Sequence, residues 1–350
     1  MGIVQAADSK IFTVLVLCTL VILATALYFA SSIFAPLTFA FFILALVWPM
    51  HKFLQERLPR GLALFITLSA TIVVFLAFGS IIAWSLSSIA DWLISNINRF
   101  QTLYVQGTDW LEEHGIFVAG TLADTFDVAW LIRMFQEVAK RLNRLAGFGI
   151  LIFVFLMLAL LETEEFRQRL MQVGKSKQGA KLIEAAREIA AKFRRYMVVR
   201  TQLSILTGFV VAAFAGLTGV EPAIAWGLLA FVLNYIPFVG SFAATILPGV
   251  FAMAQLDTWQ AVIIVFAGLA VIQFLIGNYL EPLVAGAALS ISPFAVVFAV
   301  FFWGFLWGIP GAFIGVPILI TVIVICAQYP SSQWIATLLS GKAPNTASKG

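Results

Sequence analysis

Residues 201–341 contain no Lys or Arg, and their charged side chains are limited to three acids. The stretch is almost entirely apolar, but Pro and Gly interrupt it at 234–240 and again at 308–311. Irregular backbone and ionisable side chains are costly inside a bilayer and are kept where they serve a function. A long apolar stretch with two such interruptions is typical of a membrane transport core.

The composition of the whole chain indicates a helical membrane protein. Apolar residues make up 62% of the sequence and charged residues 11%, whereas charged residues approach about a quarter of an average soluble domain. Apolar runs of about 18 residues or more recur, and each can cross about 30 Å of hydrocarbon. The sequence therefore predicts an all-α polytopic membrane protein. Its net charge of +4 comes from short loops beside the spans, so we expect contact with membrane lipid and not with nucleic acid.

The apolar runs predict about eight membrane segments. Two of them are long segments that Pro and Gly break, at 222–255 and 293–328. The intact runs are 11–30, 37–50, 61–86, 147–161, 202–217 and 261–280. The expected parts of the chain are N-terminal spans (1–86), a polar helical insertion (87–145), a fourth span with a basic amphipathic helix (146–200), the transport core (201–328) and a polar tail (329–350).

Basic residues predict the orientation of these segments. The stretch 162–200 contains ten Lys and Arg against five Glu, which marks it as cytoplasmic by the positive-inside rule. Counting spans from there places both termini in the cytoplasm and the insertion outside. Within the basic stretch, an apolar stripe at helical spacing predicts an amphipathic helix on the inner membrane surface. The stripe consists of Leu182, Ala186, Ile189, Phe193 and Met197.

The insertion 87–145 carries two apolar stripes at spacings of three and four, which predict helices. These stripes either pack on their own subunit or form the contact between subunits of an oligomer. The first consists of Leu86, Ile89, Leu93, Ile97, Phe100 and Tyr104, and the second of Leu131, Phe135, Val138, Leu142 and Leu145.

Each broken segment is either one kinked, tilted span or a re-entrant hairpin. Arms of about 15 residues reach only about 22 Å at about 1.5 Å per residue, which favours hairpins. Charge counting cannot separate the two arrangements, because the region has no Lys or Arg. Small faces in the second segment, Gly304-x-x-x-Gly308 and Gly311-x-x-x-Gly315, suit the close approach of helices.

The breaks are the candidate sites for a solute or an ion. Proline removes an N–H group and frees a carbonyl on the preceding turn, and freed carbonyls and half-helix ends bind polar solutes and cations in transporters. Asn, Tyr and Ser side chains add hydrogen-bonding groups beside the first break. The candidate residues are Asn234, Tyr235, Pro237, Gly240 and Ser241 at the first break and Gly308, Pro310 and Gly311 at the second.

Glu281 is the acid most suggestive of function. It follows Asn278-Tyr279, which echoes Asn234-Tyr235, and it precedes Pro282. A charged side chain at the bilayer centre costs about 2.5–3.5 kcal/mol on insertion scales. With no Lys or Arg in this half of the chain to pair with, Glu281 is expected to carry a proton or bind a cation. The alternative is a helix cap at the membrane edge.

Other chemistry finds no support in the sequence. Cys18 and Cys326 lie inside apolar spans without disulfide or metal spacing, and His51 and His114 lie near loops, where we expect surface residues. Motifs for metalloproteases, hydrolases and nucleotide-binding loops are absent, so we expect no enzyme activity, metal or cofactor. Any transport is then downhill or driven by a gradient.

The motifs of the C-terminal half, taken in order, resemble the autoinducer-2 exporter (AI-2E) family. They are Leu233-Asn-Tyr-Ile-Pro-Phe-Val-Gly240, Asn278-Tyr-Leu-Glu-Pro282, Ser292-Pro293 and Gly304-Phe-Leu-Trp-Gly-Ile-Pro-Gly-Ala-Phe-Ile-Gly-Val-Pro317. The resemblance implies a transporter of the bacterial inner membrane. Relatives are described as exporters of autoinducer-2 or as sodium(lithium)/proton antiporters. They are also described as homopentamers in which the broken helices move like an elevator.

Three functions are therefore open. The first is a secondary transporter that exports a small polar solute, such as autoinducer-2 or a related metabolite, from a site between the two breaks. The second is a Na⁺(Li⁺)/H⁺ antiporter centred on Glu281. The third is a non-transporting membrane scaffold that uses the insertion 87–145.

Overall fold

The computed structural model describes residues 2–115, 147–163, 165, 169, 172–285 and 291–341. Within these residues the secondary structure is helical, apart from an isolated bridge between Ile291 and Ser340. Five of the helices are long and apolar enough to cross a membrane. The prediction of an all-α polytopic membrane protein is thereby confirmed.

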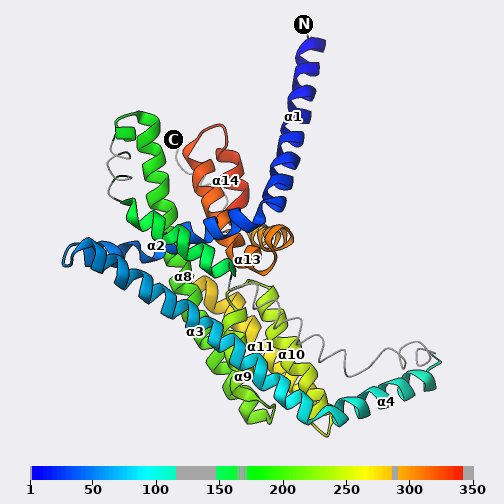
Figure 1. Ribbon diagram of the computed structural model, residues 1–350. Coiled ribbons are helices and arrows are strands. Elements are labelled where there is room, and N and C mark those ends of the chain that lie inside the picture. The colour runs from blue at the N-terminus through cyan, green and yellow to red at the C-terminus, as the bar shows by residue number, and fades with distance from the viewer. Residues whose placement is uncertain are drawn as a thin grey trace. The chain divides into compact units, whose positions relative to one another are not determined.

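Figure 1 shows the helices coloured in chain order. Gly147–Leu161 forms a further apolar helix. The others are α1 (Gly2–Phe29), α2 (Ser31–Gln55), α3 (Arg60–Ser95), α4 (Ile97–Glu113), α8 (Lys177–Thr218), α9 (Ala223–Leu233), α10 (Val239–Gln255), α11 (Trp259–Phe274), the π-helix η1 (Leu275–Leu280), α12 (Glu281–Ala285), α13 (Pro293–Gln328) and α14 (Gln333–Leu339).

The chain divides into two compact units. Unit 1 consists of Met1–Pro49, Phe148–Ala190 and Ile291–Gly350, and unit 2 of Met50–Gly147 and Ala191–Ser290. The two broken segments fall in different units: the first lies in unit 2 and the second in unit 1.

Unit 2 is a bundle of α3, α8, α9, α10 and α11, which lie side by side in Figure 1. Each of these helices buries an apolar stripe in one shared core. Aromatic rings from three of its helices and from α4 meet there, with Phe251 between Trp92, Phe100 and Trp226 at centroid distances of 5.5, 5.5 and 4.8 Å. The buried core residues include Ile89, Leu93, Val211, Ala215, Ala225, Leu229, Ala252, Val265 and Leu269.

The first apolar stripe of the insertion packs within its own chain. Ile89 and Leu93 are buried in the core of unit 2, and Phe100 packs against them. Intramolecular packing is thus confirmed for these residues of the stripe. The second stripe, at 131–145, lies outside the described residues.

The first broken segment is a helical hairpin. Helices α9 and α10 pack against each other, and the backbone N–H of Glu221 and the side chain of Gln255 join the two ends of the hairpin. Between the arms, the Val239 N–H donates to the Pro237 carbonyl over 2.7 Å, and Phe238 has φ 62° and ψ −55°. This is a γ-turn of the rare, strained form. The hairpin prediction is confirmed for this segment.

The second broken segment, α13, reverses direction at Gly308, where φ is 66° and ψ is −146°. A Cβ atom at Gly315 would lie 2.8 Å from the Ala299 carbonyl oxygen, and one at Gly311 would overlap the Trp303 carbonyl. These pairs bracket the turn from opposite arms, so α13 is a hairpin with closely packed arms. The small residues that the sequence marked for packing serve this close approach.

The rest of unit 1 surrounds this second hairpin. The Trp307 indole N–H near its turn donates to the Leu27 carbonyl over 3.0 Å, and rings from α2 and from Gly147–Leu161 pack beside it. At the open end of the hairpin, α14 folds back along α13, and the Ser292 N–H donates to the Leu339 carbonyl. The expected polar tail therefore contains a packed helix.

The basic stretch and the fifth span form one helix. Helix α8 runs unbroken over 42 residues, where the sequence predicted a separate surface helix before the span. Of the predicted stripe, Phe193 is buried, but Leu182 is 55% exposed. Ala185 and Tyr196, which are not part of the predicted stripe, are buried as well.

The expectation that His51 lies on the surface is wrong, since its side chain is only 1% exposed. The Thr67 hydroxyl donates to the Ala63 carbonyl, so it accepts a hydrogen bond from His51 Nδ1 at 2.9 Å. The Gln55 amide donates to His51 Nε2, also at 2.9 Å. Sequence position near a loop hid this role, because α2 extends five residues beyond the predicted end of the span to Gln55.

We expect Gly308→Ala to destabilise the protein. The backbone at Gly308 lies in a region that is almost exclusive to glycine, and a Cβ there costs about 1–3 kcal/mol. The measurement is the melting temperature of the purified protein in detergent. Gly79→Ala in α3 is the matched control, because a Cβ at Gly79 meets nothing within 4 Å. Equal melting temperatures for both variants would contradict this account of the turn.

We expect His51→Ala to lower the free energy of unfolding by about 2 kcal/mol, because it opens a cavity and removes the partners of Gln55 and Thr67. His114→Ala is the control, since His114 is exposed at the end of α4. Chemical unfolding followed by Trp fluorescence measures both. A loss of the same size at His114 would show that the buried network does not stabilise the protein.

Candidate solute-binding site

Helix α8 presents polar side chains to the interior of unit 2. Tyr196, Arg200 and Ser204 follow at intervals of four residues, so they lie on one face of the helix. All three are buried, Arg200 with 6% and Ser204 with 0% exposure. Thr201 lies beside them on the same turn as Arg200. Because these polar side chains are buried, they need hydrogen-bond partners inside unit 2.

Two of these side chains hold the turn of the first hairpin. The Asn234 amide donates to the Ser204 hydroxyl over 3.2 Å, and the Tyr235 hydroxyl donates to Thr201 Oγ1 over 3.0 Å. Short side chains can meet in this way because the helices approach closely at Gly208 of α8. A Cβ there would lie 2.9 Å from the Gly227 carbonyl oxygen of α9.

Arg200 also joins α8 to the start of α12. Its Nη1 donates to Glu281 Oε2 over 3.0 Å, and its Nε donates to the Tyr196 hydroxyl over 3.3 Å. The guanidinium carbon lies 5.7 Å from the centre of the Tyr196 ring. The Glu281 side chain is 30% exposed, so the pair is buried on the arginine side and reaches the surface on the acid side.

The expectation that Glu281 has no basic partner is therefore wrong. Arg200 lies one residue before the stretch without Lys or Arg, and it was assigned to the basic cytoplasmic segment. The two residues are 81 positions apart in the chain. The signal that could have identified Arg200 is its spacing with Tyr196 and Ser204 on one helix face.

We call this group of buried and half-buried residues the polar cluster. It draws on two helices, α8 and α12, and on the turn of the first hairpin, and it contains one ion pair and three further hydrogen bonds. Its members are Tyr196, Arg200, Thr201, Ser204, Asn234, Tyr235 and Glu281.

The echo of Asn234-Tyr235 at Asn278-Tyr279 does not join the polar cluster. Asn278 donates to the Phe274 carbonyl of its own helix, and Tyr279 is 73% exposed. Both lie in the π-helix η1, which ends at Leu280, and Pro282 follows as the second residue of α12. Proline has no N–H for the preceding turn, and a π-helical turn rotates the side chains relative to an α-helix.

The other predicted site residues divide between the two units. Pro237 and Gly240 form the buried turn of the first hairpin, with half-buried Ser241 after them. A Cβ at Gly240 would overlap the Leu233 carbonyl, so this glycine is needed for the turn to close. Gly308, Pro310 and Gly311 form the turn of the second hairpin, in unit 1. A site shared by both breaks stays a prediction.

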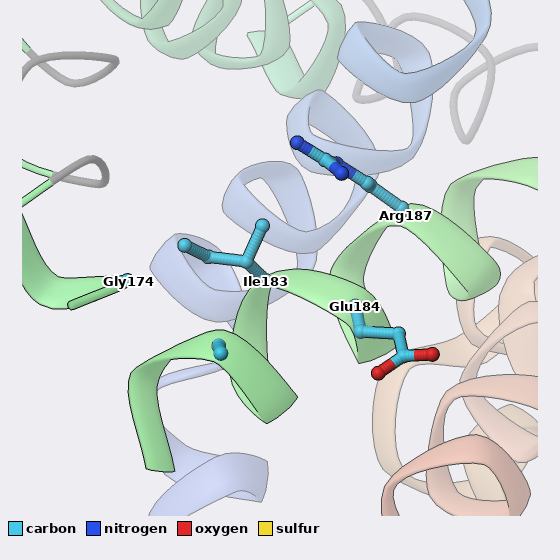
Figure 2. A pocket seen from close by; sticks show the side chains of 5 residues that line it. Gly174, Ile183, Glu184 and Arg187 are labelled. Atoms are coloured by element: carbon cyan, nitrogen blue, oxygen red, sulfur yellow. The ribbon is translucent and has the colours of Figure 1, made fainter. Parts of the chain in front are cut away.

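The polar cluster offers buried hydrogen-bond donors and acceptors and one acid. Among the described residues, no group of three or more His, Cys, Asp and Glu side chains could hold a metal ion. A hollow of about 390 Å³ lies elsewhere, on the basic part of α8 beside Ile183, Glu184 and Arg187 (Figure 2). It is shallow and lies outside the polar cluster, so we do not assign the solute to it.

A polytopic helical protein with two helical hairpins and a buried polar cluster has the features of a membrane transporter. Comparison with known proteins agrees with this class. The family model described as AI-2E family transporter matches residues 17–331, so the chain belongs to the AI-2E transporter family.

Several bacterial proteins are similar to the chain over most of its length. The AI-2 transport protein TqsA of Escherichia coli is 29% identical to this chain. The similarity covers 93% of this chain and 95% of TqsA. A protein of Borreliella burgdorferi whose name assigns it to transport is 28% identical. The similarity covers 89% of this chain and 86% of that protein. A Haemophilus influenzae protein named in the same way is 25% identical, over 93% and 95%.

We expect Glu281→Leu to destabilise the protein by about 2 kcal/mol, because it leaves the buried Arg200 guanidinium without its counter-charge. A fully buried pair that loses one partner costs about 3–5 kcal/mol, and the exposure of Glu281 reduces this. Unfolding in detergent measures the loss. The double variant Arg200→Met/Glu281→Leu should recover most of it, since neither charge remains unpaired.

The matched control for this ion pair is Glu221→Leu. Glu221 is exposed and uses its backbone N–H and carbonyl at the base of the first hairpin, so a side-chain change there should have little effect. A double variant no more stable than Glu281→Leu alone would refute the proposed coupling between the two charges.

Proposed function

We propose that the protein is a secondary transporter that exports a small polar solute through the polar cluster, with ion-gradient coupling and movement of the helical hairpins. The observation that carries this proposal is the position of the first hairpin. Its turn begins at Asn234 and Tyr235, and both side chains bind α8 at the level of a buried ion pair. Irregular backbone is thus placed beside hydrogen-bonding groups inside an apolar bundle.

The hydrogen bonds at this turn suit a reversible contact. Asn234 to Ser204 and Tyr235 to Thr201 are bonds between neutral groups, each with a net contribution of about 0.5–1.5 kcal/mol. A solute with hydroxyl or carbonyl groups can replace either bond at little cost. The elevator-like movement implied by the family resemblance would exchange these bonds for contacts with the solute.

Autoinducer-2 is the first solute to test. The name of the Escherichia coli relative assigns AI-2 transport to that protein, over nearly the whole length of both chains. We extend this substrate to the present chain as part of the proposal. The polar cluster supports it because its neutral donors and acceptors match a small, hydroxylated, polar molecule.

The antiporter alternative centres on Glu281, and the ion pair bears on it. A cation at Glu281 would compete with the Arg200 guanidinium at 3.0 Å, so its binding requires the pair to separate. We therefore rank antiport second. The scaffold alternative ranks third, because the first stripe of the insertion packs inside unit 2.

The family resemblance also implies a location and an oligomeric state for the transporter. We propose a location in the bacterial inner membrane with both termini in the cytoplasm, and assembly into a homo-oligomer, with a pentamer implied by the resemblance. Large apolar side chains are exposed along α1, α2 and α3, which suits contact with lipid or with another subunit. Examples are Leu23, Phe41, Phe65 and Leu76.

Transport tests the proposal directly. In proteoliposomes loaded with autoinducer-2, the protein should release the solute under an imposed proton or sodium gradient. Asn234→Ala should lower the initial rate about fivefold, because it removes a cluster contact worth about 1 kcal/mol and leaves Ser204 without its donor. Asn98→Ala, at an exposed position of α4, should release the solute like the unaltered protein.

The same vesicles separate the alternatives. Release equal to that of protein-free liposomes would rule out autoinducer-2 as the solute. Sodium-driven pH changes that depend on Glu281, in the absence of added solute, would favour antiport instead. Solute release that persists in Asn234→Ala at the full rate would place the site away from the first hairpin.

A further inference from the structure

Gln273 on α11 is a buried amide that no part of the described chain satisfies. Its side chain is 7% exposed, and its Nε2 has no hydrogen-bond partner among the described residues. A buried donor without a partner costs about 1–3 kcal/mol, so native proteins keep one where a ligand, ion or water completes it. This residue could not be predicted from the sequence, because a single Gln in an apolar span carries no motif.

The packing of α8 against α11 and η1 brings Gln273 to the level of Thr207. Leu203 shares a cluster with Ile276, and Val211 shares one with Leu269. On α8 the position midway between Leu203 and Val211 is Thr207, and on the facing stripe Gln273 lies between Leu269 and Ile276. The two helices run antiparallel, so these two buried polar residues lie at the same level.

This level lies next to Ser204, the member of the polar cluster nearest to Thr207 along α8. Thr207 is 0% exposed and lies one turn from Ser204, the acceptor of the Asn234 amide. The Thr207 hydroxyl donates to the Leu203 carbonyl, so its oxygen remains able to accept a hydrogen bond. A buried donor and a buried acceptor thus lie at one level of the bundle, one turn from the polar cluster.

The packing of α10 gives the same level for the hairpin. A Cβ at Gly249 would overlap the ring of Phe266, which fixes how α10 and α11 pass each other. Gln273 lies seven residues after Phe266 on α11. Helix α10 runs antiparallel to α11, so the same level is reached seven to eight residues before Gly249, at the first turn of α10, which contains Ser241. The π-helix η1 begins two residues after Gln273, and π-helical turns occur frequently at functional sites.

We propose that Gln273 contacts the transported solute, with its Nε2 donating to a hydroxyl or carbonyl oxygen of a small uncharged molecule. The Thr207 oxygen, at the same level, would accept from a hydroxyl of the same molecule. This inference rests on the proposed function and adds a binding residue to it. It predicts that the site extends from the polar cluster into the space between α8 and α11.

Gln273→Met tests the proposal, because Met keeps the length of the side chain and removes its polar atoms. The ligand-free variant should melt at a higher temperature than the unaltered protein, since the unsatisfied amide is gone. With autoinducer-2 as the probe, the KM for release from proteoliposomes should rise about tenfold, the effect of one lost hydrogen bond. Greater stability combined with weaker binding is a result that a merely structural glutamine would not give.

Ser85→Ala is the matched control. Ser85 Oγ is also buried without a hydrogen-bond partner among the described residues, but it lies on α3, one turn before Ile89. This variant should keep the KM of the unaltered protein. An unchanged KM in Gln273→Met, with normal release by the unaltered protein, overturns the role of Gln273 and leaves the proposed function intact. No release by the unaltered protein rules out autoinducer-2 as the solute and, with it, the contact of Gln273 with that solute.

Discussion

The structure of unit 2 depends on the cost of removing a guanidinium from water. Arg200 is 6% exposed in an otherwise apolar bundle, and such a charge is tolerated only when hydrogen bonds and a counter-charge surround it. Tyr196 provides a hydroxyl and a ring on the same helix, and Glu281 provides the acid from the start of α12. Meeting this requirement fixes α8 against α12 at one level, and the turn of the first hairpin binds α8 one turn away. The contacts of Arg200 in the polar cluster thus have a structural cause, the burial of one charge, which is independent of the proposed solute binding.

The two hairpins solve the same problem with different backbone chemistry. Each reverses the direction of an apolar segment. The buried backbone N–H and C=O groups of each turn therefore need hydrogen-bond partners. The first uses a γ-turn at Phe238 with a hydrogen bond from Val239 to Pro237, and the second places Gly308 in a conformation that is almost exclusive to glycine. Both are closed by glycines that let backbone approach backbone, Gly240 in the first and Gly311 in the second. Reversal in so few residues leaves no room for a polar loop, which is why each segment still looks like one long apolar run in the sequence.

The features that could be predicted from the sequence are those set by local chemistry. Apolar length predicts the helices, and Pro237 and Gly308 mark the two reversals because proline lacks an N–H and glycine tolerates positive φ. Features that depend on distant partners could not be predicted. Charge counting assigned Arg200 to a basic segment and left Glu281 unpaired, although the fold brings them to 3.0 Å. The similar sequence around Asn234 and Asn278 suggested similar roles, but the π-helix and Pro282 leave Asn278 exposed. Burial of Gln273 follows from the packing of α11 against α8, which no local pattern encodes.

In the proposed site, the strengths of these contacts suggest which side would move. The turn of the first hairpin is attached to α8 through two neutral hydrogen bonds, each worth about 0.5–1.5 kcal/mol, and a polar solute can replace them. The contact between α8 and α12 is an ion pair whose arginine is buried, and separating it would cost more because the guanidinium would remain without its counter-charge. A solute that enters beside Gln273 therefore meets a fixed wall formed by α8 and α12 and a weakly attached wall formed by the hairpin turn. In the proposed transport cycle, the hairpin turn is the part that yields.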